Sequence, residues 1–284
     1  MTDRVTRPPL STLRGLLRST HLGPSLAVTL VAVGLGIGVQ LPLWRLVVLG
    51  LALLLNQFSI GLSNDWLDAE RDRAVGRTDK PVALGLISAR AVRNCAFATA
   101  LASLLLTIPL GALATVANAV FIASAWGYNA ALKNTPLSVL PYVVSFGLLP
   151  LIVALARPVP AFAAPWALAL GALLGVAAHF ANVLPDLADD ERTGIAGLPH
   201  RIGRRASGVV IVVSLGLGGI LAFVGPVGRT TPVQWIGLVL TVALAVAIAV
   251  PLRRPPTRLL FQLIIAAALL NVVVLAFSGD RLLL

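Results

Sequence analysis

Long apolar runs, separated by short segments rich in Pro, Gly and charged residues, cover most of the chain. A helix needs about 20 apolar residues to cross the hydrocarbon core of a bilayer. The runs, cut at Pro, Gly and charged clusters, predict helices at about residues 22–40, 43–63, 91–109, 112–131, 137–155, 164–184, 206–226, 232–250 and 258–277. The pattern therefore predicts an all-α integral membrane protein with nine transmembrane helices.

The composition agrees with a chain that lies in a bilayer. Hydrophobic residues make up 58% and charged residues 12% of the 284, and the mean hydropathy is +0.93, whereas a soluble domain has about 25% charged residues. This leaves no room for a separate soluble catalytic domain, so residues 1–284 are interpreted as one transmembrane domain. The net charge of +11 does not indicate nucleic acid, because the basic residues lie singly or in small groups between apolar runs.

The basic residues also orient the predicted helices. With the N-terminal segment 1–21 in the cytoplasm, only four of the 22 Lys and Arg residues fall on the outer side: Arg45, Arg157, Arg229 and Arg281. Such an excess on one side is the positive-inside signature of a cell-membrane protein. Two of the cytoplasmic connections, at about 64–90 and 185–205, are long enough to form an active site that faces the cytoplasm.

Nine of the 11 acidic residues lie in these two connections: Asp65, Asp68, Glu70, Asp72, Asp79, Asp186, Asp189, Asp190 and Glu191. Each cluster contains the spacing N-x-x-x-D-x-x-x-D, as Asn64, Asp68 and Asp72 and again 118 residues later as Asn182, Asp186 and Asp190. Acids at the edge of a membrane core are unfavourable unless a cation offsets their repulsion. Two copies of one spacing favour a shared cation site over solvated helix ends.

The spacing places each trio on one side of a helix. Positions i, i+4 and i+8 span only about 80° of the helix circumference, so two carboxylate stripes can face each other across a central cavity. Oxygen ligands without His or Cys favour Mg²⁺, which takes one or two carboxylates and completes its shell with water and phosphate oxygens. The sequence thus predicts a diphosphate held by Mg²⁺, with two ions expected.

The residues that carry these motifs resemble the UbiA superfamily of intramembrane prenyltransferases. Residues 64–72, followed by Arg-Thr-Asp-Lys-Pro at 77–81, are similar to the first aspartate motif of that family and its basic continuation, with Lys80 where Arg is commoner. Residues 182–190, followed by Leu-Pro-His-Arg-Ile-Gly at 198–203, resemble the second aspartate motif. The resemblance implies a nine-helix fold, a cavity open to the cytoplasm, Mg²⁺, and transfer of an isoprenyl group from its diphosphate.

One element departs from the family pattern. The family often has Tyr-x-x-x-Lys after its fourth helix, whereas Tyr128 and Lys133 are five residues apart. Five residues rotate the Lys by about 140° relative to the Tyr if both lie on the same helix. Lys133 is nevertheless expected to contact the diphosphate.

Bond breakage makes the leaving diphosphate more negative, so catalysis needs cations preorganised at its oxygens. We expect Asp68 and Asp72 to hold one Mg²⁺ and Asp186 and Asp190 the other, with Asn64 and Asn182 completing the metal shells or donating to phosphate. Arg can grip phosphate through two hydrogen bonds. The candidate diphosphate contacts, for which membrane anchoring is the alternative role, are Arg71, Arg77, Lys80, Lys133 and Arg201.

The prenyl tail needs only an apolar slot between helices, so its length is not encoded by a motif. Three residues are candidate contacts for the acceptor or the allylic cation: Asn56, Tyr128 and His179. Helix-to-helix hydrogen bonding is the alternative role for Asn56 and His179, and an interfacial aromatic belt is the alternative for Tyr128.

The function that this pattern favours is transfer of a prenyl group to a lipophilic aromatic or quinone-precursor acceptor. The alternatives are cyclisation of the prenyl diphosphate, transfer to a polar lipid or sugar phosphate, and cation transport. Transporters place ionisable residues near the bilayer midplane, whereas the clustered acids here lie at helix ends on one side. No obligate protein partner is expected.

Overall fold

The computed structural model describes residues 9–185, 187, 194–249 and 258–284. In this part of the chain the long helices are α1 (Pro9–Ser19), α2 (Leu22–Gly38), α3 (Leu43–Leu67), α5 (Ala89–Thr107), α6 (Ala112–Ala130), α7 (Leu140–Leu155), α8 (Pro165–Val183), α10 (Leu198–Val224), α11 (Pro232–Ala249) and α12 (Arg258–Ala276). Short helices are α4 (Ala69–Ala74), η1 (Ile108–Leu110), η2 (Leu132–Asn134) and η4 (Gly279–Leu282). The described residues form no β-strand, so the all-α prediction is confirmed.

Each apolar run that the sequence predicts as a helix coincides with one of the long helices from α2 to α12. Four of them, α3, α5 with η1, α8 and α10, are long and apolar enough to cross a membrane, and a fifth span results if the bent pair α1 and α2 is counted as one. The described parts of α7, α11 and α12 are apolar but shorter.

Two helices reach further than their apolar runs, into segments that carry polar residues. Helix α3 continues past residue 63 to Leu67, and α10 begins at Leu198 instead of about residue 206. Gly203 interrupts α10 with φ 79°, a backbone conformation that glycine adopts readily. Both extensions lie in the segments for which the sequence predicts an active site.

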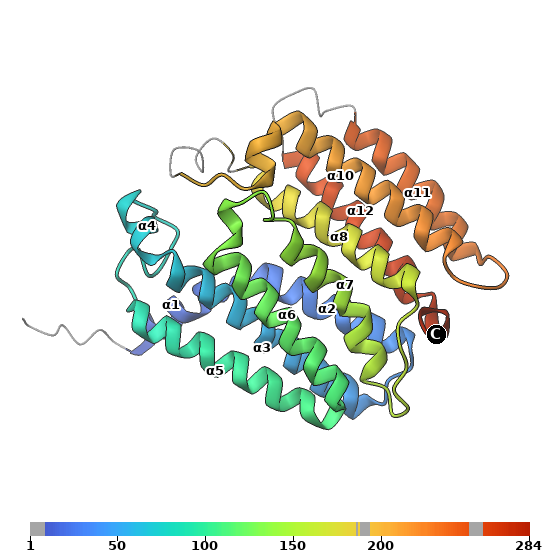
Figure 1. The fold of residues 1–284 in the computed structure, drawn as a ribbon, viewed down its shortest axis with the longest axis horizontal. Helices are drawn as coiled ribbons and strands as arrows, with labels where there is room; N and C mark the ends of the chain where they lie inside the picture. Colours follow the sequence, from blue (N-terminus) through green and yellow to red (C-terminus); the bar gives the residue numbers. More distant parts are fainter. Residues whose placement is uncertain (1–8, 186, 188–193, 250–257) are drawn as a thin grey trace, which may run out of the picture.

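The bundle packs through close helix contacts where side chains are small. Helix α3 packs against α5, α7 against α8, and α8 against α10 (Figure 1). A Cβ on Gly171 would lie 2.4 Å from the Phe146 carbonyl oxygen, and one on Gly175 would lie 2.3 Å from that of Tyr142. Glycine at these positions lets α8 approach the backbone of α7, as small residues do between membrane helices.

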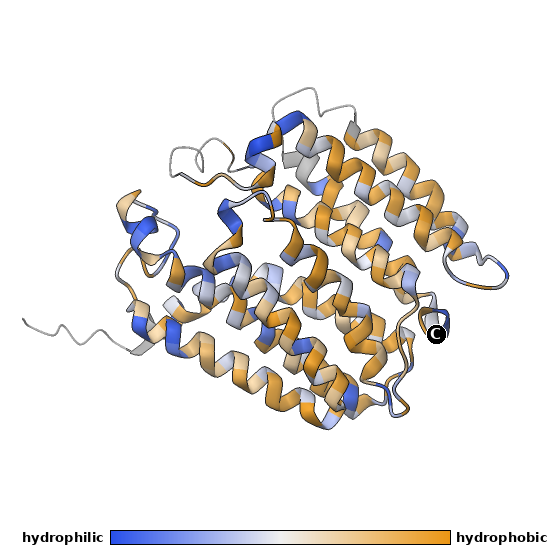
Figure 2. Cartoon of the chain, in the orientation of Figure 1, coloured by the Kyte–Doolittle hydropathy of each residue, from blue (hydrophilic) through white to orange (hydrophobic). Residues whose placement is uncertain are grey.

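The charged residues gather at the ends of the bundle. In Figure 2 the helices are hydrophobic along most of their length, and hydrophilic residues concentrate around α4, the end of α6 and the start of α10. At the other end, Arg45 donates to the carbonyls of Ala156 and Arg157, and Arg281 donates to that of Arg229. The four arginines predicted outside thus belong to two local contacts that lie away from the acidic cluster.

Candidate active site

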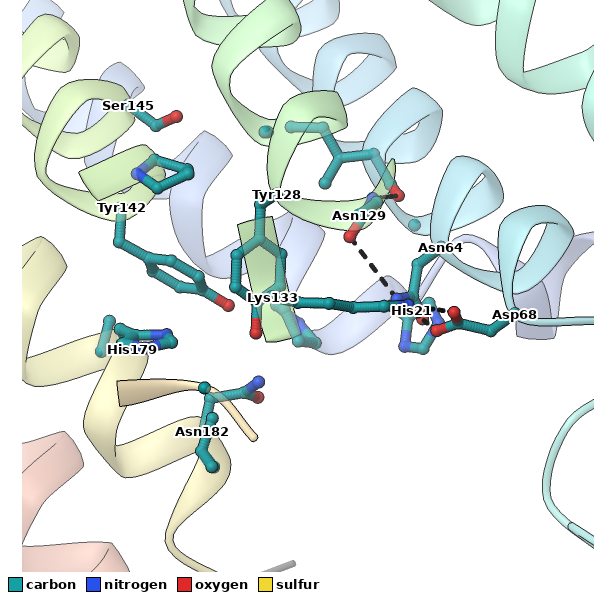
Figure 3. Close-up of a pocket in the computed structure, with 18 of the residues that line it drawn as sticks. His21, Asn64, Asp68, Tyr128, Asn129, Lys133, Tyr142, Ser145, His179 and Asn182 are labelled. Carbon is teal, nitrogen blue, oxygen red and sulfur yellow. Dashed lines mark hydrogen bonds and ion pairs between the residues drawn. The ribbon is translucent and has the colours of Figure 1, made fainter. Parts of the chain in front are cut away.

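A cavity of about 560 Å³ opens at the end of the bundle that carries α4 (Figure 3). This volume lies within the range of about 300–1,000 Å³ that is usual for ligand sites. Helices α2, α3, α4, α6, α7, α8 and α10 contribute to its wall, together with the loop between α4 and α5. Both tyrosines and all three histidines of the chain line it: Tyr128, Tyr142, His21, His179 and His200.

The first predicted trio faces this cavity as one group. Asn64, Asp68 and Asp72 all line it, although α3 ends at Leu67 and α4 begins at Ala69. Two hydrogen bonds of helical spacing connect the helices across this break: the Asp68 amide donates to the Asn64 carbonyl (3.0 Å) and the Asp72 amide to the Asp68 carbonyl (2.8 Å). The i, i+4, i+8 geometry is therefore retained, and Asn64 Nδ2 donates to Asp68 Oδ2 at 3.1 Å.

Basic side chains neutralise these carboxylates. Lys133 Nζ donates to Asp68 Oδ1, and Arg71 Nη2 lies 2.9 Å from Asp68 Oδ2 and 3.5 Å from Asp72 Oδ1. Asp68 and Asp72 are both almost fully buried. Cation and carboxylate are thus held together at a site shielded from water, where their interaction is stronger than at a surface.

The structure resolves the unusual spacing of Tyr128 and Lys133. Helix α6 ends at Ala130, and Lys133 lies in the short helix η2 after a break at Ala131 (φ −142°). The rotation expected for a continuous helix therefore does not apply, and both side chains line the cavity. In Figure 3 the Lys133 chain extends past Tyr128 toward Asn64 and Asp68.

Arg77 and Lys80, on the loop after α4, also line the cavity and have carboxylate neighbours of their own. Arg77 donates through Nε and Nη2 to both oxygens of Asp79, each at 2.7 Å. These two bonds lower the pKa of Asp79 from 3.8 to about 2. Lys80 Nζ lies 2.6 Å from Asp65 Oδ1 and 3.2 Å from Asn64 Oδ1.

Burial shifts two of the ionisable groups away from their charged forms. It raises the pKa of Asp72, an effect to which the charge of Asp68 adds and which Lys80, Arg71 and Arg77 partly offset. Burial also lowers the pKa of Lys133, although the hydrogen bond to Asp68 opposes the shift. Burial disfavours the charged form of Asp72, and a bound dication would stabilise that form.

The opposite wall of the cavity is aromatic and has polar tips. The rings of Tyr128 and Tyr142 meet edge to face at 5.2 Å, and the Tyr142 ring lies 4.9 Å from that of His179. His179 Nε2 lies 3.0 Å from Ser138 Oγ, while no hydrogen-bond partner of its Nδ1 exists among the described residues. His179 therefore makes a hydrogen bond to a neighbouring segment, which is the alternative role expected from the sequence, and it also lines the cavity.

The remaining predicted residues have different positions. Asn182 lines the cavity at the end of α8, whereas Asp186 and Asp190 lie outside the described residues. Asn56 is fully buried and donates to Asn118 Oδ1 at 2.7 Å, while the adjacent Gln57 lines the cavity. Arg201 is exposed and donates to the Ala196 carbonyl, and the cavity wall at that point is formed by Pro199 and His200.

Several lining residues were missed by the sequence motifs. His21 and Ser145 belong to no motif, His200 lies in the continuation of the second motif but was no site candidate, and Asp65, adjacent to Asn64, contacts the site through Lys80. The rarity of histidine in the chain was the available signal, since all three histidines lie here. Ser145 carried no such signal, because serines in membrane helices usually bond to nearby backbone carbonyls.

The donor set fits a hard cation. Asn64, Asp68 and Asp72 present amide and carboxylate oxygens to one cavity, and Mg²⁺ commonly takes only one or two carboxylates from a protein. Within the described residues no three His, Cys, Asp or Glu side chains converge on one point. This is consistent with Mg²⁺, which would take its other ligands from water and phosphate.

Comparison with known proteins agrees with this site. Residues 25–263 match the UbiA prenyltransferase family. The chain belongs to this family. A 4-hydroxybenzoate octaprenyltransferase of Ralstonia nicotianae is 33% identical over 187 residues, which are 64% of this chain and 63% of the relative. The match therefore spans a little less than two thirds of the relative's length.

Solved structures share the fold of this UbiA-family chain. A UbiA homolog from Archaeoglobus fulgidus, bound to GPP and Mg²⁺, has a TM-score of 0.71 and 14% identity, covering 96% of this chain and 98% of that one. The apo structure of a UbiA homolog from Aeropyrum pernix K1 has a TM-score of 0.70 and 17% identity, covering 88% and 96%. At these identities the likeness establishes the fold.

Proposed function

We propose that this protein transfers an isoprenyl group from a prenyl diphosphate to a lipophilic aromatic or quinone-precursor acceptor and releases diphosphate. One observation carries the proposal: Asn64, Asp68 and Asp72 share a membrane-protein cavity with Arg71, Lys80 and Lys133. Family membership and the name of the Ralstonia relative support the same reaction and the aromatic acceptor.

Mg²⁺ is the proposed cofactor, and it would supply positive charge to the diphosphate oxygens as the allylic C–O bond breaks. Asn64, Asp68 and Asp72 would hold one ion. We expect a second ion at Asn182, Asp186 and Asp190. The Archaeoglobus neighbours bound to GPP and to DMAPP with Mg²⁺ support the use of this metal and donor class.

The basic residues of the cavity would stabilise the departing diphosphate. Lys133 and Arg71 bond to the carboxylates in this structure, so metal binding at those carboxylates would release their N–H groups toward phosphate. Lys80 and Arg77 already have separate carboxylate partners. Donors that are fixed before reaction stabilise developing charge without reorganisation.

The aromatic wall would receive the allylic group and the acceptor. The faces of Tyr128 and Tyr142 can stabilise the positive charge that develops on the allyl carbon. After the new C–C bond forms, the aromatic ring carbon must lose its proton, and His179, which lines the cavity, could accept it at Nδ1 in the tautomer whose Nε2–H donates to Ser138 Oγ. Asn56 is buried and would influence a bound acceptor only through the adjacent Gln57, which lines the cavity.

The membrane topology belongs to the same proposal. We expect nine crossings, a cytoplasmic N-terminal segment and a cavity that opens to the cytoplasm. The gathering of hydrophilic residues around the cavity end of the bundle supports this orientation, because short cytoplasmic loops are rich in Lys and Arg.

The reaction is tested with the purified protein in detergent. Geranyl, farnesyl, geranylgeranyl and longer diphosphates are supplied with and without Mg²⁺, together with a pooled acceptor library, and products are identified by mass. A product with the mass of acceptor plus prenyl group supports the proposal and names both substrates. A product of the prenyl group alone would instead establish cyclisation, and a folded protein inert with every donor would contradict both reactions.

A further inference from the structure

Asp65 lies between Asn64 and Asp68, which both line the cavity, yet its carboxylate contacts other groups. It is 1% exposed, and it does not line the cavity as its neighbour Asn64 does. Its Oδ1 lies 2.6 Å from Lys80 Nζ and 3.0 Å from His21 Nε2. Its Oδ2 is buried without a hydrogen-bond partner among the described residues.

The contacts around Asp65 show which N–H groups of Lys80 are in use. Lys80 Nζ and Asp65 Oδ1 both approach the same nitrogen of His21, at 3.3 and 3.0 Å. A neutral ring nitrogen either donates or accepts, and the shorter contact is satisfied if Nε2–H donates to Asp65. Lys80 then uses two of its three N–H groups, on Asp65 and Asn64, and keeps one for the cavity that it lines.

The other buried cation of the cavity is held differently. Lys133 pairs with Asp68, a proposed metal ligand, so its partner is lost when a dication binds there. Lys80 lies near enough to Asp72 to act on its charge, but its direct partner is Asp65. A buried lysine without such a partner would be drawn to the nearest carboxylates.

We propose that Asp65 is a positioning residue that gives Lys80 a dedicated counter-ion. Asp65 fixes the Lys80 ammonium at the cavity wall and keeps it away from Asp68 and Asp72, so that Lys80 does not add a further cation that competes with Mg²⁺ for these carboxylates. Through the bond from Lys80 to Asn64 Oδ1, the same contact also orients the first residue of the metal-binding trio. The inference rests on the proposed function, since it concerns the diphosphate and metal site.

The test is a double-mutant cycle between Asp65→Asn and Lys80→Met. The asparagine has the same size and keeps an oxygen acceptor but has no charge. Without its counter-ion, Lys80 should compete for Asp68 and Asp72, so kcat should fall by about tenfold or more and the Mg²⁺ concentration for half-maximal rate should rise. In the Lys80→Met background, Asp65→Asn should change either quantity by less than about twofold.

Two further variants separate positioning from folding. Glu70→Gln removes one exposed carboxylate from the same segment and should leave kcat and the Mg²⁺ requirement unchanged. Lys80→Arg should retain activity, because a guanidinium can reach both oxygens of Asp65, including the unpartnered Oδ2. An equal loss from Asp65→Asn with and without Lys80 would overturn the inference and leave Asp65 a purely structural role.

A second readout keeps the inference testable if prenyl transfer fails. Binding of inorganic pyrophosphate with Mg²⁺ is measured by calorimetry for the four proteins of the cycle: wild type, Asp65→Asn, Lys80→Met and the double variant. Asp65→Asn should weaken binding by about fivefold or more only where Lys80 is present. Inert wild-type protein that still shows this coupling would refute the proposed reaction alone, whereas binding without the coupling would refute the role of Asp65.

Discussion

At the scale of single residues, charge in the cavity converges on Asp68. Its two oxygens receive Lys133 and Arg71, and its Oδ2 also receives the Asn64 amide. The carboxylate is therefore saturated by protein donors in this structure. A metal ion bound at Asp68 would therefore displace Lys133 and Arg71, whose N–H groups could then bind the diphosphate.

This exchange predicts the effect of removing Lys133. Lys133→Met should lower Mg²⁺-dependent diphosphate release by about 100-fold, because removing one preorganised donor from the site of developing charge typically costs about 10²–10³ in rate. Arg73→Met is the control, since Arg73 on the short helix α4 is exposed and does not line the cavity. Single-turnover rates for both variants check the prediction, and equal rates in the two would contradict it.

A second residue-level prediction concerns the ion pair of Arg77 and Asp79. Because the pKa of Asp79 is lowered in the folded state, its contribution to stability is fully present above its ordinary value of 3.8 and disappears as the pH falls through about 2. The Asp79 side chain is 57% exposed, so this contribution should be below about 1 kcal/mol.

The measurement is the thermal midpoint of wild type and Asp79→Asn in detergent at several pH values. The wild type should unfold at a slightly higher temperature near pH 6, and the difference should shrink toward pH 2. A difference that grew at low pH would contradict the assignment.

At the scale of helices, the position of the aromatic wall depends on how closely α8 approaches α7. Tyr142 belongs to α7 and His179 to α8. The close contacts at Gly171 and Gly175 leave no room for a methyl group against the α7 backbone. The distance between the two helices therefore sets the shape of the proposed acceptor end of the cavity.

Gly175→Ala should consequently destabilise the protein by about 1–3 kcal/mol, the usual cost of overpacking, and should lower activity by displacing Tyr142. Gly216→Ala in α10 makes the same chemical change where no atom lies within 4 Å of the new Cβ. It should be neutral or stabilising by up to about 1 kcal/mol, because alanine favours helix more than glycine does. Thermal midpoints check both, and equal destabilisation would refute the packing argument.

The helices themselves were predictable, because uninterrupted apolar runs leave a chain in lipid few alternatives to helix. Their polar extensions were not, because the continuation of α3 to Leu67 and the start of α10 at Leu198 lie outside the apolar runs. The spacing of Asn64, Asp68 and Asp72 predicted their common face. It could not reveal that Asp65 binds Lys80 and His21, since these contacts join segments 15 and 44 residues apart.

At the scale of the whole molecule, the cavity and its charges lie at one end of the bundle, and the arginines predicted outside form separate contacts elsewhere. The long helices expose many leucine and valine side chains, so the exterior of the bundle is apolar. Such a surface suits the hydrocarbon of a bilayer.

The orientation can be checked by thiol labelling. In a Cys95→Ser background, Glu70→Cys should react with a membrane-impermeant reagent only in inverted vesicles, and Arg229→Cys only in right-side-out vesicles, because these positions are expected on opposite sides. Labelling of both from the same side would contradict the proposed topology.

The proposed Mg²⁺-dependent diphosphate site is built on the first aspartate motif. The most direct test compares diphosphate release by wild type, Asp68→Asn and the control Glu70→Gln in one experiment, at saturating donor and across Mg²⁺ concentrations. We predict that release requires Mg²⁺, that Glu70→Gln matches wild type, and that Asp68→Asn loses about 100-fold or more. Asp68→Asn that stays folded and releases diphosphate at the wild-type rate would contradict the account.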